Sequence, residues 1–127
     1  MNIKNNILKA CLKQCYFING TAYAGKSTMC RMLAEKYHLL LCGENYGLDR
    51  LLQIITPEEQ PNLSYFNTMK DWQEFVNRTP DEYLAWIRGN GYEAADFEIA
   101  ELIRLSGDRK TIVDTNIPLD ILRQIAD

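Results

Sequence analysis

The sequence has no long hydrophobic run. No stretch of the 127-residue chain approaches about 18 consecutive apolar residues, so the sequence predicts no membrane-spanning helix. Residues 1–14 carry three lysines and lack the run of about 7–15 apolar residues that defines a secretory signal peptide. In the absence of such a segment, the expected location of the protein is cytoplasmic.

The sequence is also short of positive charge and of histidine. Its 14 Lys and Arg residues stand against 17 Asp and Glu, which gives a net charge of −3. This balance argues against nucleic acid as a partner, because the phosphate backbone attracts clustered positive charge. His38 is the single histidine, so no site with several histidine ligands exists. No CxxC pair occurs, so the four cysteines are predicted to be free thiols rather than zinc ligands.

The composition, 46% hydrophobic and 24% charged, is that of one globular domain covering residues 1–127. Three short runs that are apolar on both faces, 14–19, 38–42 and 111–114, are predicted to be strands of a buried parallel sheet. A helix is predicted over 26–37, which makes the start of the chain a βαβ unit and the fold α/β. The apolar side chains that share one face of this helix are Met29, Met32, Leu33 and Tyr37.

The region between the second and third predicted strands, about 47–105, is predicted to be helical. Capping boxes with proline at the first helical position occur at 56–59 and 79–82, but Pro61 cuts short any helix that begins at the first of them. The triplet Gly89-Asn90-Gly91 predicts a break in the helical pattern. A further helix beginning near Thr68 is indicated by Trp72, Phe75 and Val76.

The last helix is predicted to open at Pro118. Its inward-facing side chains are expected to be Leu119, Leu122 and Ile125.

The most specific feature is a glycine-rich segment between the first predicted strand and helix. It matches the pattern G-x-x-x-x-G-K-[ST] at every fixed position. The segment reads Gly20-Thr21-Ala22-Tyr23-Ala24-Gly25-Lys26-Ser27.

Each fixed position of this segment has a physical reason. The two glycines permit backbone angles and close approaches that a Cβ forbids. The amides between them form a nest for anionic oxygens, and the helix N-terminus adds its positive end. Lys26 is placed to reach the β- and γ-phosphates, and the Ser27 hydroxyl is placed to coordinate Mg²⁺. Thr28, next in line, either touches the α-phosphate or satisfies local helix amides.

These residues resemble the P-loop kinases of the nucleoside monophosphate kinase and shikimate kinase group. The match is specific from about residue 14 to 42 and looser from 111 to 120. The resemblance implies transfer of the γ-phosphoryl group of ATP, with Mg²⁺, to a small-molecule acceptor. It also implies a three-layer α/β/α fold with strand order 2-3-1, in which the helical region 47–105 forms or borders the acceptor site.

Asp114 ends the third predicted strand, as the carboxylate of a Walker B motif does. It is expected to hold Mg²⁺, a Mg²⁺-bound water or the acceptor; alternatively, it is a strand-end turn carboxylate. Related kinases often read Asp-Gly-x-Pro-Arg at this point. Here the sequence reads Asp114-Thr-Asn-Ile-Pro118-Leu, without the arginine.

Four further residues are candidates for the acceptor site. Because ligands of open α/β sheets bind beyond the carboxyl ends of the strands, Glu44 and Asp49 are expected to orient the acceptor hydroxyl or accept its proton. Arg50 and, with weaker grounds, Arg88 are candidates to bind an anionic group of the acceptor. The alternative for all four is an ordinary solvated surface charge.

The same residues weigh against other P-loop classes. The guanine motif N-K-x-D and the switch motif D-x-x-G of small GTPases are absent. Thr115 stands where many hydrolytic ATPases carry a water-activating glutamate. These absences favour a kinase, whose catalysis depends on positioning and charge neutralisation. A nucleotide-binding module without turnover stays open as the alternative.

Kinases of this group usually have five parallel strands, and only three are predicted here. The resemblance therefore implies that the chain is an N-terminal portion of a longer protein.

Overall fold

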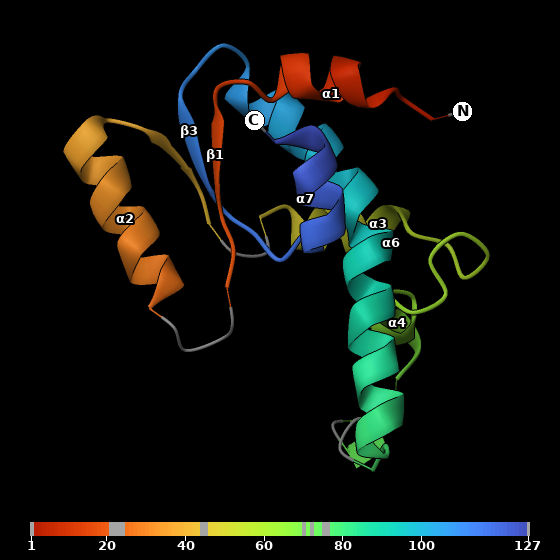
Figure 1. The fold of residues 1–127 in the computed structure, drawn as a ribbon. Helices are drawn as coiled ribbons and strands as arrows, with labels where there is room; N and C mark the ends of the chain where they lie inside the picture. The colour runs from red at the N-terminus through yellow and green to blue at the C-terminus, as the bar shows by residue number, and fades with distance from the viewer. Residues whose placement is uncertain are drawn as a thin grey trace. The chain divides into compact units, whose positions relative to one another are not determined.

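A computed structural model of the chain describes residues 2–20, 25–43, 46–69, 71, 73–74 and 77–126. These residues form two compact units (Figure 1). The first comprises Met1–Tyr46 and Glu98–Asp127, and the second comprises Gly47–Phe97. The second unit therefore takes in most of the helical region 47–105 that the sequence indicates.

The first unit is built on three parallel strands, β1 (Cys15–Ile18), β2 (Leu40–Cys42) and β3 (Thr111–Asp114). Their order is β1-β3-β2, so the strand that comes last in the sequence lies in the middle. The α/β class, the parallel sheet and this order are confirmed as predicted. All four residues of β3 are buried, as a strand that is apolar on both faces requires.

The register of the strands brings their carboxyl ends to one edge of the sheet. Ile18 of β1 is paired with Asp114 of β3, and Cys42 of β2 is paired with the preceding residue, Val113. The segments that follow all three strands therefore start at the same edge, where an open α/β sheet places its ligands.

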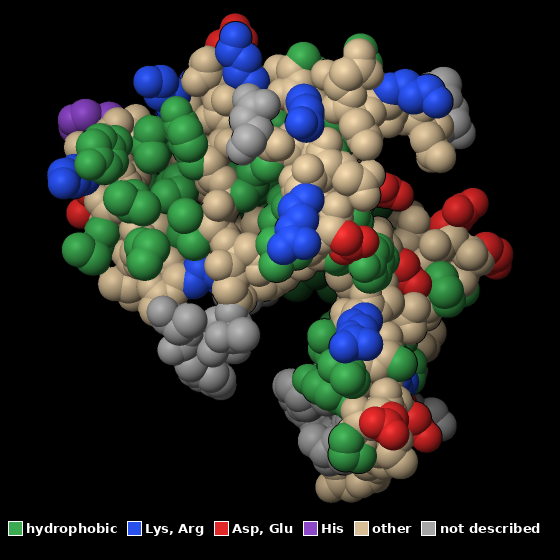
Figure 2. All heavy atoms as spheres, in the orientation of Figure 1, with side chains coloured by type: hydrophobic (Ala, Val, Ile, Leu, Met, Phe, Trp, Pro, Cys, Tyr) green, Lys and Arg blue, Asp and Glu red, His purple; other side chains and the backbone are tan. Residues whose placement is uncertain are grey.

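Helix α2 (Lys26–Tyr37) has the predicted bounds and packs against β3 and β2. Its predicted inward face is wrong, however. Cys30 is the buried residue of α2, whereas Met29 and Met32 are 51% and 65% exposed. The apolar spacing is real, but the face of α2 that is buried is the one that carries Cys30. Figure 2 shows hydrophobic side chains gathered on the surface over α2 and the sheet.

Two short helices lie across the sheet from α2 in Figure 1. Helix α1 (Asn5–Cys11), which the sequence pattern did not predict, contacts α7 (Leu119–Ile125). In α7, Leu122 and Ile125 are buried as predicted, but Leu119 is 54% exposed. Pro118 precedes the helix with ψ near 139°, so it is the residue before the first turn rather than part of it.

The second unit contains α3 (Leu48–Ile54), α4 (Tyr65–Thr68) and the first part of α6 (Pro80–Ser106). The capping box at 79–82 is confirmed: Glu82 N donates to Thr79 Oγ1 (3.2 Å), and Thr79 N donates to Glu82 Oε2 (3.4 Å). The box at 56–59 forms only a turn, since Pro61 follows it too closely for a helix. Trp72, Phe75 and Val76 lie outside the described residues.

The predicted break at Gly89-Asn90-Gly91 is wrong, because α6 continues through all three residues. Gly89 serves a packing purpose instead. A Cβ at this position would lie 2.6 Å from Cγ of Asn62. The Asn62 side chain approaches the helix closely because it is anchored there, with its Nδ2 donating to Glu93 Oε1 at 2.8 Å.

Candidate nucleotide-binding site

The candidate site begins where β1 ends and α2 starts. Gly25 has φ 77° and ψ 15°, a left-handed conformation that is strained for any residue with a Cβ, and α2 starts at the next residue. The glycine of the motif is therefore required by the backbone. Gly20 follows β1 and its neighbour Asn19, and no atom of another described residue lies within 4 Å of the place where its Cβ would be. Thr21, Ala22, Tyr23 and Ala24 lie outside the described residues.

The side chains of Lys26 and Ser27 meet the carboxylate of Asp114. Lys26 Nζ lies 3.1 Å from Asp114 Oδ1, and Ser27 Oγ donates to Asp114 Oδ2 at 2.9 Å. Asp114 is 2% exposed and the Lys26 side chain 9%, so the ion pair is nearly withdrawn from water. Residues separated by 87 positions in the sequence thus form one cluster, because the central position of β3 places Asp114 beside the end of β1.

The segment after β3 completes the surroundings of the lysine. Lys26 Nζ also donates to the carbonyl oxygen of Thr115 (3.3 Å) and to Oδ1 of Asn116 (3.1 Å). The backbone N of Ile117 donates to Thr115 Oγ1, and Asn19 Nδ2 donates to the Ile117 carbonyl at 2.8 Å. These bonds tie the segment after β3 to the end of β1 and fix the acceptors around the ammonium group.

The donor set of the cluster fits a magnesium ion that is held mainly by phosphates. Asp114 Oδ1 is buried and has no hydrogen bond of good geometry; its described contact is the Lys26 ammonium. The described part of the chain has no group of three His, Cys, Asp or Glu side chains suited to a metal. Mg²⁺ in nucleotide sites needs only one or two protein oxygens, because phosphates and water supply the rest. Ser27 and Asp114 offer such oxygens.

A buried thiol lies close to the cluster. Cys30 of α2 is 0% exposed, and its pKa is raised first by burial and then by the negative charge of Asp114. Cys30 is therefore a neutral packing residue near the charged pair. Its thiol supports the position of α2 without adding charge to the site.

Sequence reasoning did not select Thr115 or Asn116 as site residues; it considered Thr115 only as the residue that stands in place of a water-activating glutamate. Thr28, which it did identify, lies in the first turn of α2, where its hydroxyl accepts a long 3.5 Å hydrogen bond from Arg31.

The candidates for the acceptor site belong to other segments of the chain. Glu44 lies outside the described residues. Asp49 and Arg50 are exposed in the first turn of α3, and Arg88 is exposed on α6. These three belong to the second unit.

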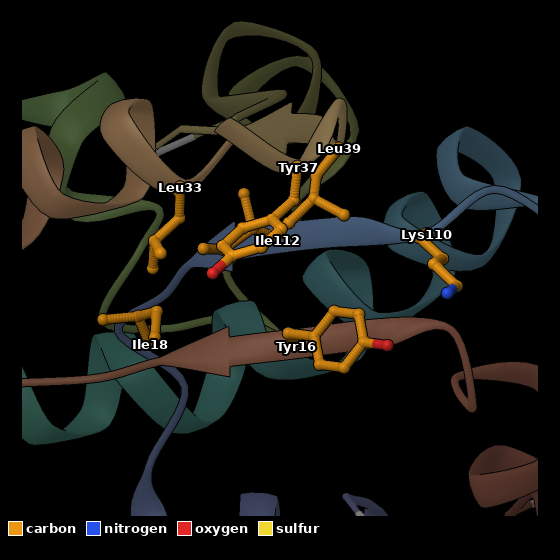
Figure 3. Close-up of a pocket in the computed structure, with 7 residues that line it drawn as sticks. All are labelled: Tyr16, Ile18, Leu33, Tyr37, Leu39, Lys110 and Ile112. Carbon is orange, nitrogen blue, oxygen red and sulfur yellow. The ribbon is translucent and has the colours of Figure 1, made fainter. Parts of the chain in front are cut away.

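A groove of about 390 Å³ lies beside α2 in the first unit (Figure 3). It contains one cationic side chain and is otherwise lined by apolar side chains and tyrosines, so it does not suit a polyphosphate. The lining residues are Tyr16, Ile18, Leu33, Tyr37, Leu39, Lys110 and Ile112.

Comparisons with known proteins give no match: a scan against protein-family models, a search of curated proteins and a search of solved structures all found none. No helix of the described residues has the length and apolar character needed to cross a membrane.

Proposed function

We propose that this chain binds ATP with Mg²⁺ in the glycine-rich segment 20–28 and acts as a small-molecule kinase. The observation that carries the proposal is the meeting of Lys26, Ser27 and Asp114 within 3.1 Å. A lysine and a hydroxyl at the start of a helix, joined to a carboxylate at the end of the central strand, are the groups that bind phosphate and Mg²⁺ together.

Each residue has a role that follows from its chemistry. Lys26 binds the terminal phosphate groups as a mobile positive charge, and the backbone amides of the segment bind the rest. Ser27 and Asp114 hold Mg²⁺, which neutralises phosphate charge when it is bound. The acceptor is a small nucleotide, nucleoside or other hydroxyl compound. We assign Glu44 and Asp49 to its hydroxyl and Arg50 and Arg88 to an anionic group that it carries.

Binding of MgATP to Lys26→Ala and to a matched control, Lys36→Ala, tests the first part of the proposal. Both lysines belong to α2, but Lys36 lies in its exposed last turn, beside Tyr37. We expect calorimetric titration to show a loss of at least 30-fold in affinity for Lys26→Ala, since charge-assisted hydrogen bonds contribute about 1.5–3 kcal/mol each. The control should bind within about twofold of the parent protein. Unchanged affinity for MgATP in Lys26→Ala contradicts the proposed phosphate-binding segment 20–28.

The second part is tested by ADP release with a panel of acceptors: nucleosides, nucleoside monophosphates and shikimate-like alcohols. A kinase releases ADP only with a suitable acceptor. MgATP binding without release for any acceptor favours the alternative, a nucleotide-binding module without turnover.

A further inference from the structure

The groove beside α2 exists because this helix does not cover the whole sheet. Helix α2 packs mainly against β3 and β2, whereas Tyr16 of the neighbouring strand β1 is 49% exposed. Tyr16 is paired with Ile112 of β3, and side chains two positions apart on a strand lie on the same face. Tyr16, Ile18 and Ile112 therefore share one face of the sheet and form the floor of the groove (Figure 3).

The opposite side of the groove is formed by α2 and the residues that follow it. Leu33 and Tyr37 belong to α2, and Leu39 leads into β2. In Figure 3 the ring of Tyr37 borders the groove from the helix and the ring of Tyr16 borders it from the sheet. Aromatic rings beside aliphatic side chains favour a flat apolar ligand. The volume of about 390 Å³ lies within the range of about 300–1,000 Å³ that is typical of small-molecule sites.

The charges at the groove are all positive. Lys110 lies directly before β3, and Figure 3 shows its Nζ and the Tyr16 hydroxyl at the same end of the groove. No ion pair or side-chain hydrogen bond joins Lys110 to another described residue. Lys36 adds a second ammonium group 5.2 Å from the centre of the Tyr37 ring. None of the described residues that line the groove is acidic, so its charge is complementary to that of an anion.

We propose that this groove binds a small, planar apolar carboxylate. Its ring system lies on the apolar floor between Tyr16 and Tyr37, and its carboxylate pairs with Lys110. A single negative group at one end of an apolar molecule matches the groove, whereas further charges would lie against aliphatic side chains and lose their hydration. None of the lining residues belongs to segment 20–28, so this inference does not depend on the proposed binding of ATP.

NMR titration with 2-naphthoate and with its neutral analogue 2-naphthalenemethanol tests the proposal. We expect the parent protein to bind the carboxylate with a dissociation constant of about 0.1–1 mM, as a ligand of about 13 non-hydrogen atoms does, and the alcohol about fivefold more weakly. Lys110→Met keeps the apolar stem and removes the charge. It should lower the affinity for 2-naphthoate about fivefold, the upper range for an exposed ion pair, and change that for the alcohol less than twofold.

Two further variants separate the groove from other surfaces. Leu33→Trp fills the groove and should weaken the binding of both compounds at least tenfold, with circular dichroism to verify that the variant is folded. Lys9→Met is the matched control, because Lys9 is an exposed lysine on α1 outside the groove. It should bind both compounds within about twofold of the parent protein.

Three results would overturn the inference. Equal affinities of the parent protein for the two compounds would mean that the groove does not select a carboxylate. Unchanged binding in a folded Leu33→Trp would mean that the compounds bind elsewhere. An affinity for 2-naphthoate that falls as protein concentration rises would mean that a second copy of the chain covers the groove.

Lys26→Ala keeps this inference separate from the proposed function. It should bind 2-naphthoate as the parent protein does, whether or not the parent binds MgATP. A loss of 2-naphthoate binding in Lys26→Ala would place the carboxylate at segment 20–28. That result would overturn the inference about the groove and leave the proposed function standing.

Discussion

Replacing Gly89 by alanine tests whether the middle of α6 is built around a close approach of Asn62. In an ordinary helix this change is stabilising, by about 0.5–1 kcal/mol, because glycine loses more backbone freedom than alanine on folding. Here the new Cβ would lie 2.6 Å from Asn62 Cγ and displace a side chain whose Nδ2 donates to Glu93 Oε1 at 2.8 Å. A hydrogen bond to a carboxylate contributes about 1.5–3 kcal/mol. We therefore expect a net destabilisation of about 1–2 kcal/mol.

The contact itself is tested in a second background. In Asn62→Ala the obstructing amide is gone, and Gly89→Ala should then stabilise the protein by the ordinary helical gain of about 0.5–1 kcal/mol. The sign of the same substitution thus reverses between the two backgrounds. Urea unfolding followed by tryptophan fluorescence is suited to the measurement, because both tryptophans, Trp72 and Trp86, belong to the Gly47–Phe97 unit.

Two results would refute this reasoning. Gly89→Ala would stabilise the parent protein if the Asn62 side chain did not occupy the space beside the helix. An equal effect in both backgrounds, within about 0.3–0.5 kcal/mol, would mean that the two residues do not interact.

Two further predictions concern Glu98, which is partly buried, and Trp86, which is buried; both belong to α6. Burial raises the pKa of Glu98 to about 7, well above the value of about 4.3 for an unfolded glutamate. The folded protein should therefore lose about 2–3 kcal/mol of stability as pH rises from about 4.5 to 7.5, and Glu98→Gln should remove this loss. Urea unfolding at pH 5 and pH 8 measures the change in unfolding free energy. An equal change in the parent protein and in Glu98→Gln would count against the burial of Glu98. Trp86 Nε1 donates to the Asn62 carbonyl at 2.9 Å, so Trp86→Phe should lower the unfolding free energy by at least about 1 kcal/mol, seen in thermal unfolding by circular dichroism; no change would argue against the bond.

The parts of the fold that the sequence predicts are those that local physics fixes. The helix 26–37 is bounded by two left-handed residues, Gly25 and His38, and the structure places α2 within these limits. The strand 111–114 lies in the middle of the sheet and is buried along its whole length, which is the environment that its short, mainly apolar sequence predicts. In both cases the sequence pattern and the tertiary environment demand the same residues.

The parts that sequence reasoning missed depend on contacts between distant segments. Gly89 has the signal of a helix break, and only the approach of Asn62, 27 positions earlier, explains it as a packing residue. The spacing of Met29 and Met32 is typical of a buried face, but which face is buried depends on where the strands lie beneath the helix. Helix α1 buries no residue, so it leaves no apolar periodicity to detect.

The same distinction applies to the candidate site. Lys26 and Ser27 are identified by a local motif, and Asp114 by its place at the end of a strand. Their meeting depends on strand order, which the family resemblance implied rather than the composition or spacing. Asn116 is recognisable only from its contact with Lys26, because one asparagine in a segment after a strand is an ordinary turn residue.

The buried ion pair between Lys26 and Asp114 leads to a prediction about magnesium. When phosphate draws the Lys26 ammonium away, Asp114, at 2% exposure, keeps a charge with no cation beside it. An unpaired buried charge is strongly destabilising, about 3–5 kcal/mol when a partner is removed outright. Under the proposed function, a Mg²⁺ ion that arrives with the nucleotide would replace the ammonium as partner of the carboxylate. Nucleotide and metal should therefore bind as a couple, and the coupling should depend on Asp114.

Asp114→Asn removes the charge while keeping the shape, and with it the need for a replacing cation. We expect Mg²⁺ to strengthen ATP binding to the parent protein by at least tenfold, measured by titration with and without EDTA. In Asp114→Asn the gain in ATP affinity from Mg²⁺ should fall below about threefold, because binding of ATP without metal no longer leaves a buried carboxylate without a cation. If magnesium were bound by the phosphates alone, Mg²⁺ would strengthen ATP binding equally in both proteins. That result would mean that Asp114 does not bind the metal.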